Sequence, residues 1–161
     1  MRYSLLLVLA ACPCIAWACS PGSRLAFSCD LDNAKRVEIC QKPDSLTYAY
    51  GKPGQKPEMT FEVTNKQAFD VISSGSGGGS DYLVLPNGKT MYVLSTDVVY
   101  ERTYGNGDKT KHEEHKSLSA WVNRKAVASH QCTKVTNGKF SKNIPSHLIG
   151  TDPRDDLITS P

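Results

Sequence analysis

Histidines and carboxylates are the residues of this chain whose types could support metal or acid–base chemistry. The nearest pair of histidines lies in His112-Glu113-Glu114-His115, where they are three residues apart, and His130 stands two residues before Cys132. A zinc-protease helix needs two histidines four residues apart, with a glutamate beside the first. No helical pattern surrounds either group. We therefore expect no metal site, and interpret 105–117 as a charged hairpin tip or insertion whose role stays open.

Nucleophilic and glycosidase catalysis also lack their usual patterns. No G-x-S-x-G sequence surrounds any serine, although that turn carries the nucleophile of many hydrolases. Glycosidases need two carboxyl groups held at a fixed separation, and here Glu58 and Glu62 fall on the polar face of one predicted strand. We expect a non-enzymatic protein with no cofactor.

One stretch has the composition of a contact loop for a partner. Glycine lets a backbone approach a partner closely, serine adds a small hydroxyl, and tyrosine is a rigid interface anchor. The alternative is an inert, mobile connector. The residues of this candidate binding loop are Ser73, Ser74, Gly75, Ser76, Gly77, Gly78, Gly79, Ser80, Asp81 and Tyr82.

Strands must position this loop. Residues 58–64 alternate apolar and polar side chains, which is the period of a strand with one buried face. Asn87-Gly88 between apolar runs is a strong hairpin signal. Further strand patterns cover 25–29, 35–40, 45–51, 81–85, 89–94, 97–104, 118–122 and 126–132. We predict an all-β fold, a single antiparallel β-sandwich or barrel of about eight strands.

The domain organisation follows from these strands. The predicted antiparallel β domain covers 19–132. The chain after Cys132 is polar and contains prolines, so we expect 133–161 to be a poorly ordered tail. The strands on either side of the Gly/Ser run are too few to close a sheet separately. The run is therefore predicted to join strands within one domain rather than to link two.

The N-terminus has the pattern of a signal peptide. Arg2 precedes an apolar stretch that ends in Ala16-Trp17-Ala18, which predicts cleavage of residues 1–18 and export to the periplasm or the medium. No later stretch is long and apolar enough to span a membrane. Leu9-Ala10-Ala11-Cys12 has the form of a lipoprotein box, so that a lipid anchor at Cys12 or at Cys19 is the less favoured alternative.

The cysteines predict a disulfide-stabilised domain. Cleavage after Ala18 without lipidation leaves an even set, and an exported chain favours full pairing. The pairing stays open, because Cys29 and Cys40 could face each other across the first hairpin and either could reach Cys132. The set is Cys19, Cys29, Cys40 and Cys132.

The charge is too balanced for a nucleic-acid partner. The chain has 19 basic and 16 acidic side chains, a formal net charge of +3. The basic residues are scattered and are not interleaved with aromatic residues, as they are in single-strand binders.

Several short motifs are distributed over residues 19–132. They are Phe27-Ser28-Cys29, Val37-Glu38-Ile39-Cys40, Tyr48-Ala49-Tyr50-Gly51, Pro57-Glu58-Met59, Ser74-Gly75-Ser76-Gly77-Gly78-Gly79 and the sequence from Asn87 to Val93. Together they resemble the bacterial periplasmic inhibitors of invertebrate-type lysozyme and their uncharacterised relatives.

The resemblance implies a function as well as a fold. In that family a Ser-Gly…Tyr loop enters the lysozyme cleft and meets the catalytic carboxylates. The matching residues are Ser74, Gly75 and Ser76 with Tyr82, at a wider spacing than the compact family motif. The implied partner is a lysozyme, and a homodimer stays open. The alternative is a generic cell-envelope β-domain with a structural, adaptor or glycan-binding role. Glycan binding would need an exposed aromatic platform of Tyr92, Tyr100 and Trp121.

Overall fold

The computed structural model describes residues 19–64, 66–75, 78–103, 109–137 and 140–150 of the chain. Most of these residues lie in strands, which confirms the all-β prediction. The strands are β1 (Arg24–Leu31), β2 (Arg36–Gln41), β3 (Ser45–Gly51), β4 (Met59–Thr64), β5 (Ala68–Gly75), β6 (Gly78–Asn87), β7 (Thr90–Thr103), β8 (Lys109–Val122), β9 (Lys125–Thr136) and β10 (Ile149–Gly150). A short helix α1 (Phe140–Asn143) and a 3-10 turn η1 (Ser146–Leu148) precede β10.

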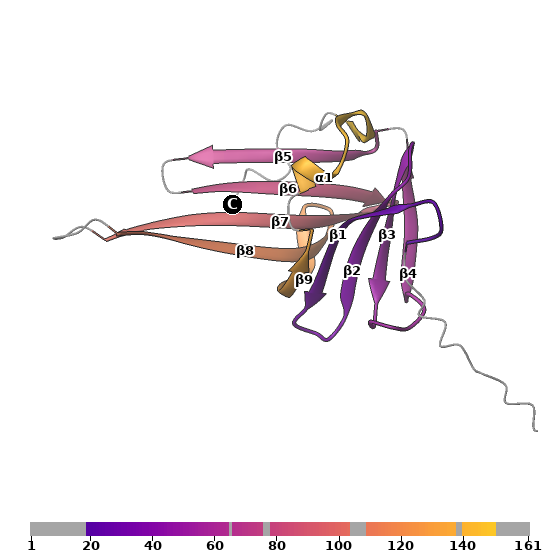
Figure 1. Ribbon diagram of the computed structural model, residues 1–161, viewed down its shortest axis with the longest axis horizontal. Helices are drawn as coiled ribbons and strands as arrows, with labels where there is room; N and C mark the ends of the chain where they lie inside the picture. Colours follow the sequence, from indigo (N-terminus) through magenta and orange to yellow (C-terminus); the bar gives the residue numbers. More distant parts are fainter. Residues whose placement is uncertain (1–18, 65, 76–77, 104–108, 138–139, 151–161) are drawn as a thin grey trace, which may run out of the picture.

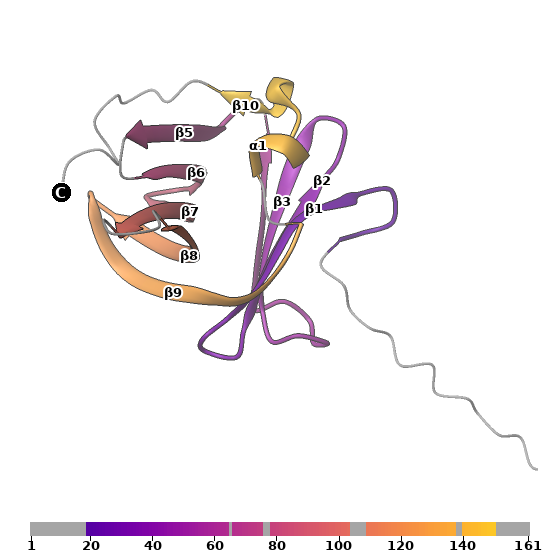
Figure 2. The ribbon, with the colours of Figure 1, turned by 60° about the vertical axis from the view of Figure 1, so that its left-hand side comes forward.

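The ten strands form one sheet, in the order β10-β5-β6-β7-β8-β9-β1-β2-β3-β4. All neighbours are antiparallel except β10 and β5, which run parallel. The sheet curls into a half-barrel, in which β1–β4 run steeply across the direction of β5–β8 (Figure 1). The long, bent β9 carries the sheet around from β8 to β1 (Figure 2).

The prediction of a sandwich or barrel of about eight strands is therefore wrong in its details. Two predicted strands, 89–94 and 97–104, contribute residues 90–94 and 97–103 to the single strand β7, because Ser95 and Thr96 continue its pairing with β8. In contrast, β5 and β10 were not predicted at all. The cause is that β5 contains part of the Ser/Gly run and β10 is only two residues long.

The concave side of the curled sheet holds the main core. Tyr48 on β3 lies 4.7 Å from the Phe61 ring and 5.0 Å from the Tyr92 ring, between ring centroids. The Tyr92 hydroxyl also contacts the Met59 sulfur at 3.3 Å. These contacts join β3 and β4 at one end of the sheet to β7 in the other half. The curl is thus filled by side chains.

The segment after Cys132 belongs to the fold. Strand β9 continues to Thr136, and Phe140, Ile144 and Leu148 are buried with exposed fractions of 1%, 6% and 7%. The Phe140 ring lies 4.6 Å from the ring of Phe27 on β1. The expected poorly ordered tail is therefore wrong for 133–137 and 140–150. These three apolar side chains, spaced four residues apart, pack into the open side of the curl.

Two disulfides join the predicted set of cysteines. They are Cys19–Cys40 and Cys29–Cys132. Cys29 and Cys40 do not face each other, because Cys29 lies opposite Val37 and Cys40 lies opposite Leu25. The disulfides indicate an oxidising, exported environment.

Cys12 and Cys19 were the two alternative sites for a lipid anchor. Because the Cys19 sulfur is bonded to Cys40, it is not available to carry a lipid. Cys12 lies outside the described residues. Within the ranges that the structure describes, no helix has the length and apolar character needed to cross a membrane.

Candidate functional site

The predicted binding loop is largely a β-hairpin. Ser73, Ser74 and Gly75 end β5, and Gly78 to Tyr82 begin β6. Cross-strand pairs are Ser73 with Ser80, Ser74 with Gly79 and Gly75 with Gly78. Ser76 and Gly77 lie outside the described residues. The β5–β6 hairpin extends beyond the body of the domain beside the long β7 and β8 (Figure 1).

Glycine at the hairpin end is needed by the sheet itself. Gly78 has a φ of +145°, and a Cβ at this position would lie 1.9 Å from the Val98 carbonyl oxygen on β7. A Cβ on Gly79 would lie 3.0 Å from the Ser73 carbonyl oxygen. Any side chain at Gly78 would force β6 away from β7. Gly78 and Gly79 therefore allow close strand pairing near the tip.

One face of the tip carries a carboxylate held by hydroxyl groups. Ser80 Oγ donates to Asp97 Oδ1 on β7 at 2.5 Å, and Tyr82 Oη lies 3.4 Å from the same oxygen. The Tyr82 ring packs against the buried Phe69, Val84 and Val93. The hydroxyl hydrogens of Ser80 and Tyr82 are thus directed at Asp97 and not at a partner. Sequence reasoning missed this role of Asp97.

The outer edge of β5 is paired over only part of its length by the described residues. Strand β10 pairs only with Ala68 and Phe69, so that residues 70–75 have no strand on that side within the described part of the chain. Ile72 has 67% of its surface exposed, and Ser73 and Ser74 are exposed beside it. Unpaired N–H and C=O groups on such an edge can pair with another chain. The tip therefore offers hydroxyls, backbone donors and one apolar side chain.

The histidine candidates are engaged within the protein. His130 Nδ1 lies 2.9 Å from Asp32 Oδ1, and His130 Nε2 lies 3.0 Å from Asn33 Nδ2. The Asn33 amide also donates to Tyr50 Oη, while its oxygen accepts from the Lys35 N–H. Nε2 must then accept a hydrogen bond, which leaves Nδ1 to donate to Asp32.

This network has a structural role. Backbone donation from Gln131, with a further contribution from His130, holds the pKa of Asp32 below its ordinary value. Neither His130 nitrogen is open to a ligand. His115 lies 3.5 Å from Glu113, and the side chain of His112 is not described. Among the described residues, no three His, Cys, Asp or Glu side chains gather in a way that could hold a metal ion.

The aromatic residues considered for glycan binding do not form a platform. Tyr92 is packed in the core against Tyr48 and Phe61. Trp121 lies on the opposite face of the sheet, since it pairs with Met91, and its indole N–H donates to Ser119 Oγ. Tyr100 is eight residues from Tyr92 on the same strand. These placements remove the feature that glycan binding would have needed.

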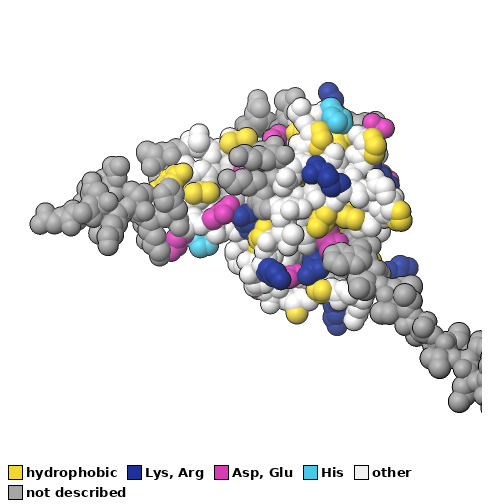
Figure 3. Space-filling view, in the orientation of Figure 1, with side chains coloured by type: hydrophobic (Ala, Val, Ile, Leu, Met, Phe, Trp, Pro, Cys, Tyr) yellow, Lys and Arg dark blue, Asp and Glu magenta, His cyan; other side chains and the backbone are white. Residues whose placement is uncertain are grey.

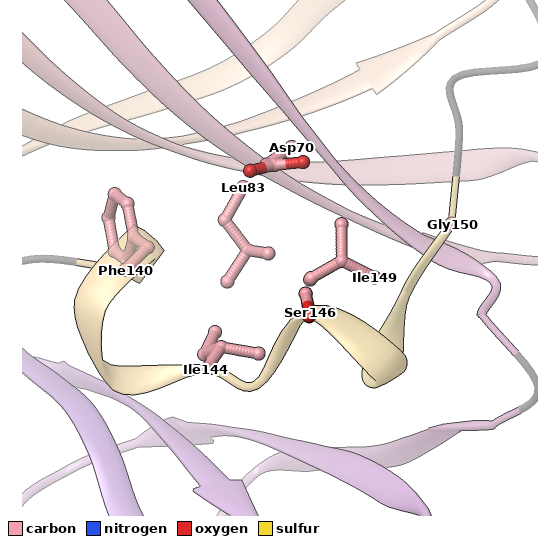
Figure 4. A pocket seen from close by; sticks show the side chains of 7 residues that line it. All are labelled: Asp70, Leu83, Phe140, Ile144, Ser146, Ile149 and Gly150. Atoms are coloured by element: carbon pink, nitrogen blue, oxygen red, sulfur yellow. The ribbon is translucent and has the colours of Figure 1, made fainter.

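A cavity of about 300 Å³ lies between β5, β6 and the C-terminal segment (Figure 4). Its lining residues are Asp70, Leu83, Phe140, Ile144, Ser146, Ile149 and Gly150. No sequence pattern predicted this cavity, because its lining comes from an unpredicted strand and from a segment expected to be a tail. The spacing of Phe140, Ile144 and Leu148 was the signal that could have indicated a packed segment.

The surface charge agrees with a balanced composition. Lys and Arg side chains are spread over the body of the domain and are not gathered in one patch on the face shown (Figure 3).

Comparison of the chain with protein-family models finds no match, and comparisons with curated proteins and with solved structures find none either.

Proposed function

We propose that this chain is an exported, non-enzymatic binding protein that inhibits an invertebrate-type lysozyme with the tip of its β5–β6 hairpin. The observation that carries the proposal is the outer edge of β5, where Ser73 and Ser74 are exposed and no strand of the described residues pairs with them on that side. The cysteine and glycine motifs that resemble lysozyme inhibitors point in the same direction. Residues 1–18 would direct export, and cleavage after Ala18 would leave Cys19 in its disulfide.

The chemistry of the tip suits an acidic cleft. Glycosidases place carboxyl groups on both sides of the scissile bond, and carboxylates accept hydrogen bonds. The hydroxyls of Ser73 and Ser74 and the N–H groups of the β5 edge are donors that need no counter-charge. Ser80 and Tyr82 instead fix the shape of the tip through Asp97. A glycine-rich hairpin is also slim enough for a cleft that binds a sugar chain.

Inhibition assays test this proposal. The purified, oxidised chain is titrated against an invertebrate-type lysozyme acting on cell-wall substrate. The double variant Ser73→Ala/Ser74→Ala should weaken inhibition by roughly tenfold for each hydroxyl that bonds a carboxylate. Ser129→Ala, at an exposed serine on β9, is the matched control and should inhibit like the original chain.

Two results would count against the proposal in different ways. Absence of inhibition at micromolar excess would reject the lysozyme target and leave a structural or adaptor role in the envelope. Inhibition that survives the double serine variant would place the contact elsewhere on the protein.

The charge of Asp97 gives an independent test. Asp97→Asn keeps an oxygen that accepts from Ser80 and Tyr82, but it removes a negative charge from the tip. If the tip meets carboxylates, this variant should inhibit more strongly, since a repulsive charge is lost. Weaker inhibition would instead indicate that the tip faces a cationic surface of the enzyme.

A further inference from the structure

We propose that the cavity between β5, β6 and the C-terminal segment binds a small amine with an apolar body, with Asp70 as the counter-charge of its ammonium group. This site is separate from the hairpin tip and goes beyond lysozyme inhibition. The inference rests on the shape of the cavity, the apolar side chains on one part of its lining and the position of one carboxylate.

The cavity combines an apolar wall with a single acidic group. Leu83, Phe140, Ile144 and Ile149 supply apolar surface, and Asp70 projects from β5 at one end (Figure 4). Phe140 and Ile144 are buried, so the apolar wall belongs to the core. A volume of about 300 Å³ is at the lower end of the range for small-molecule sites.

Asp70 is placed as a site residue and not as part of an ion pair. It lies opposite Leu83 in the β5–β6 ladder, on the side of the strand that faces the C-terminal segment. In the described part of the chain its carboxylate makes no hydrogen bond or salt bridge, and it is half-buried. A half-buried carboxylate beside apolar surface is best satisfied by a cation with its own hydrogen-bond donors.

Two close contacts place the C-terminal segment against the sheet. A Cβ on Gly150 would lie 2.0 Å from the Lys66 carbonyl oxygen, so only glycine lets β10 sit beside β5. Phe140 is fixed by its contact with Phe27. The Ser146 hydroxyl lies at the exposed part of the lining and can accept a second hydrogen bond from an ammonium group.

The ligand class follows from these groups. An anion is disfavoured by Asp70, and a large polar ligand would leave the apolar wall in contact with polar groups. A compact alkyl or arylalkyl ammonium fills the apolar space and pairs with the carboxylate. A hydrogen bond to a charged partner is the interaction that separates it from a neutral molecule of the same size.

The test uses three probes with the same six-carbon chain: hexylammonium, hexan-1-ol and hexanoate. Each is titrated into the oxidised full-length chain, and binding is followed by the amide shifts of Asp70, Leu83 and Ile149 in NMR spectra. Hexylammonium should bind about tenfold more tightly than hexan-1-ol, and hexanoate should bind most weakly. The shifts should cluster around the cavity.

Variants connect the binding to the named groups. Asp70→Asn should weaken hexylammonium binding about tenfold and leave hexan-1-ol unchanged. Asp44→Asn, at an exposed turn position, is the matched control and should change neither. Ser146→Trp, at the exposed part of the lining, should block both probes while leaving the core intact.

Three results would overturn the inference. Equal affinity for hexylammonium and hexan-1-ol would mean an apolar void without charge recognition. Hexylammonium binding that survives Asp70→Asn would place the ammonium elsewhere. Absence of shifts around the cavity would mean that the space is not a ligand site. None of these results depends on whether the hairpin tip inhibits a lysozyme.

Discussion

The two disulfides should contribute unequally to stability, and the Cys29–Cys132 bond should contribute more. The perturbation is replacement of each pair by alanines, Cys29→Ala/Cys132→Ala in one variant and Cys19→Ala/Cys40→Ala in the other. Each pair has one fully buried partner, Cys29 with 0% and Cys40 with 1% exposed. Each also has one half-buried partner. The cost of lost packing should therefore be similar in the two variants.

The loop lengths set the difference. The cysteines of one pair are 103 residues apart and those of the other pair are 21 residues apart. In the chain-entropy relation for cross-links, these loops correspond to about 4.7 and about 3.3 kcal/mol at 25 °C. The Cys29–Cys132 variant should therefore be less stable than the other by about 1.4 kcal/mol.

Urea unfolding of the original chain and both variants measures this difference. The free energies of unfolding extrapolated to water should decrease in the order original chain, Cys19/Cys40 variant, Cys29/Cys132 variant. Equal stabilities, or a lower stability for the Cys19/Cys40 variant, would refute the reasoning. Such a result would mean that local contacts of the bonds outweigh the restriction of the unfolded chain.

Two further predictions concern polar groups in and around the core. The Tyr48 hydroxyl is buried and has no hydrogen-bond partner in the described structure. Replacing it in Tyr48→Phe should therefore raise the free energy of unfolding by about 1 kcal/mol. A lower thermal midpoint for this variant would contradict the prediction. The Arg36 side chain, by hydrogen bonding, holds the pKa of Asp30 below its ordinary value of 3.8. A lowered pKa stabilises the fold fully above pH 3.8 and loses this effect as the pH falls through the folded value. Asp30→Asn should therefore flatten the loss of stability below pH 3.8 in acid titrations, and an unchanged slope would argue against the pairing.

Local signals in the sequence predicted most of the strands and several turns. The Asn87-Gly88 hairpin is present, with β6 ending at Asn87, β7 beginning at Thr90 and a φ of +61° at Gly88. The gaps between predicted strands 25–29 and 35–40, and between 118–122 and 126–132, also hold turns between paired strands, with positive φ at Ala34 and Asn123. These features depend on residues that are neighbours in sequence, which is why pattern reading could find them.

The curl of the sheet and the C-terminal packing depend on distant residues. The curl brings Met59 to Tyr92, and Phe140 becomes buried only when Phe27 is placed beside it. Neither contact has a signature in a short window of sequence. Because the composition after Cys132 is polar and contains prolines, the three apolar residues that complete the core were not recognised as core residues.

The Ser/Gly run was predicted to be a loop, but its described residues are mostly strand. Serine and glycine have low strand propensity, so the run was interpreted as a loop. The strand state comes from its neighbour β7, since Gly78 allows a backbone approach that no other residue would permit. The Asp97 role was not predicted for the same reason, because it needs the β6–β7 register that places Ser80 opposite Asp97.

The two long edges of the sheet are protected to different degrees, and this difference favours a contact role for β5. Natural edge strands usually carry charges or prolines that prevent pairing with other chains. Strand β4 carries Glu62, which pairs with Lys42 at 3.1 Å. Strand β5 from Val71 to Gly75 has no charged residue or proline, and its Ile72 is largely exposed. No strand of the described residues lies beside this part of β5, so its backbone groups can pair with a partner's strand, as the proposed function requires.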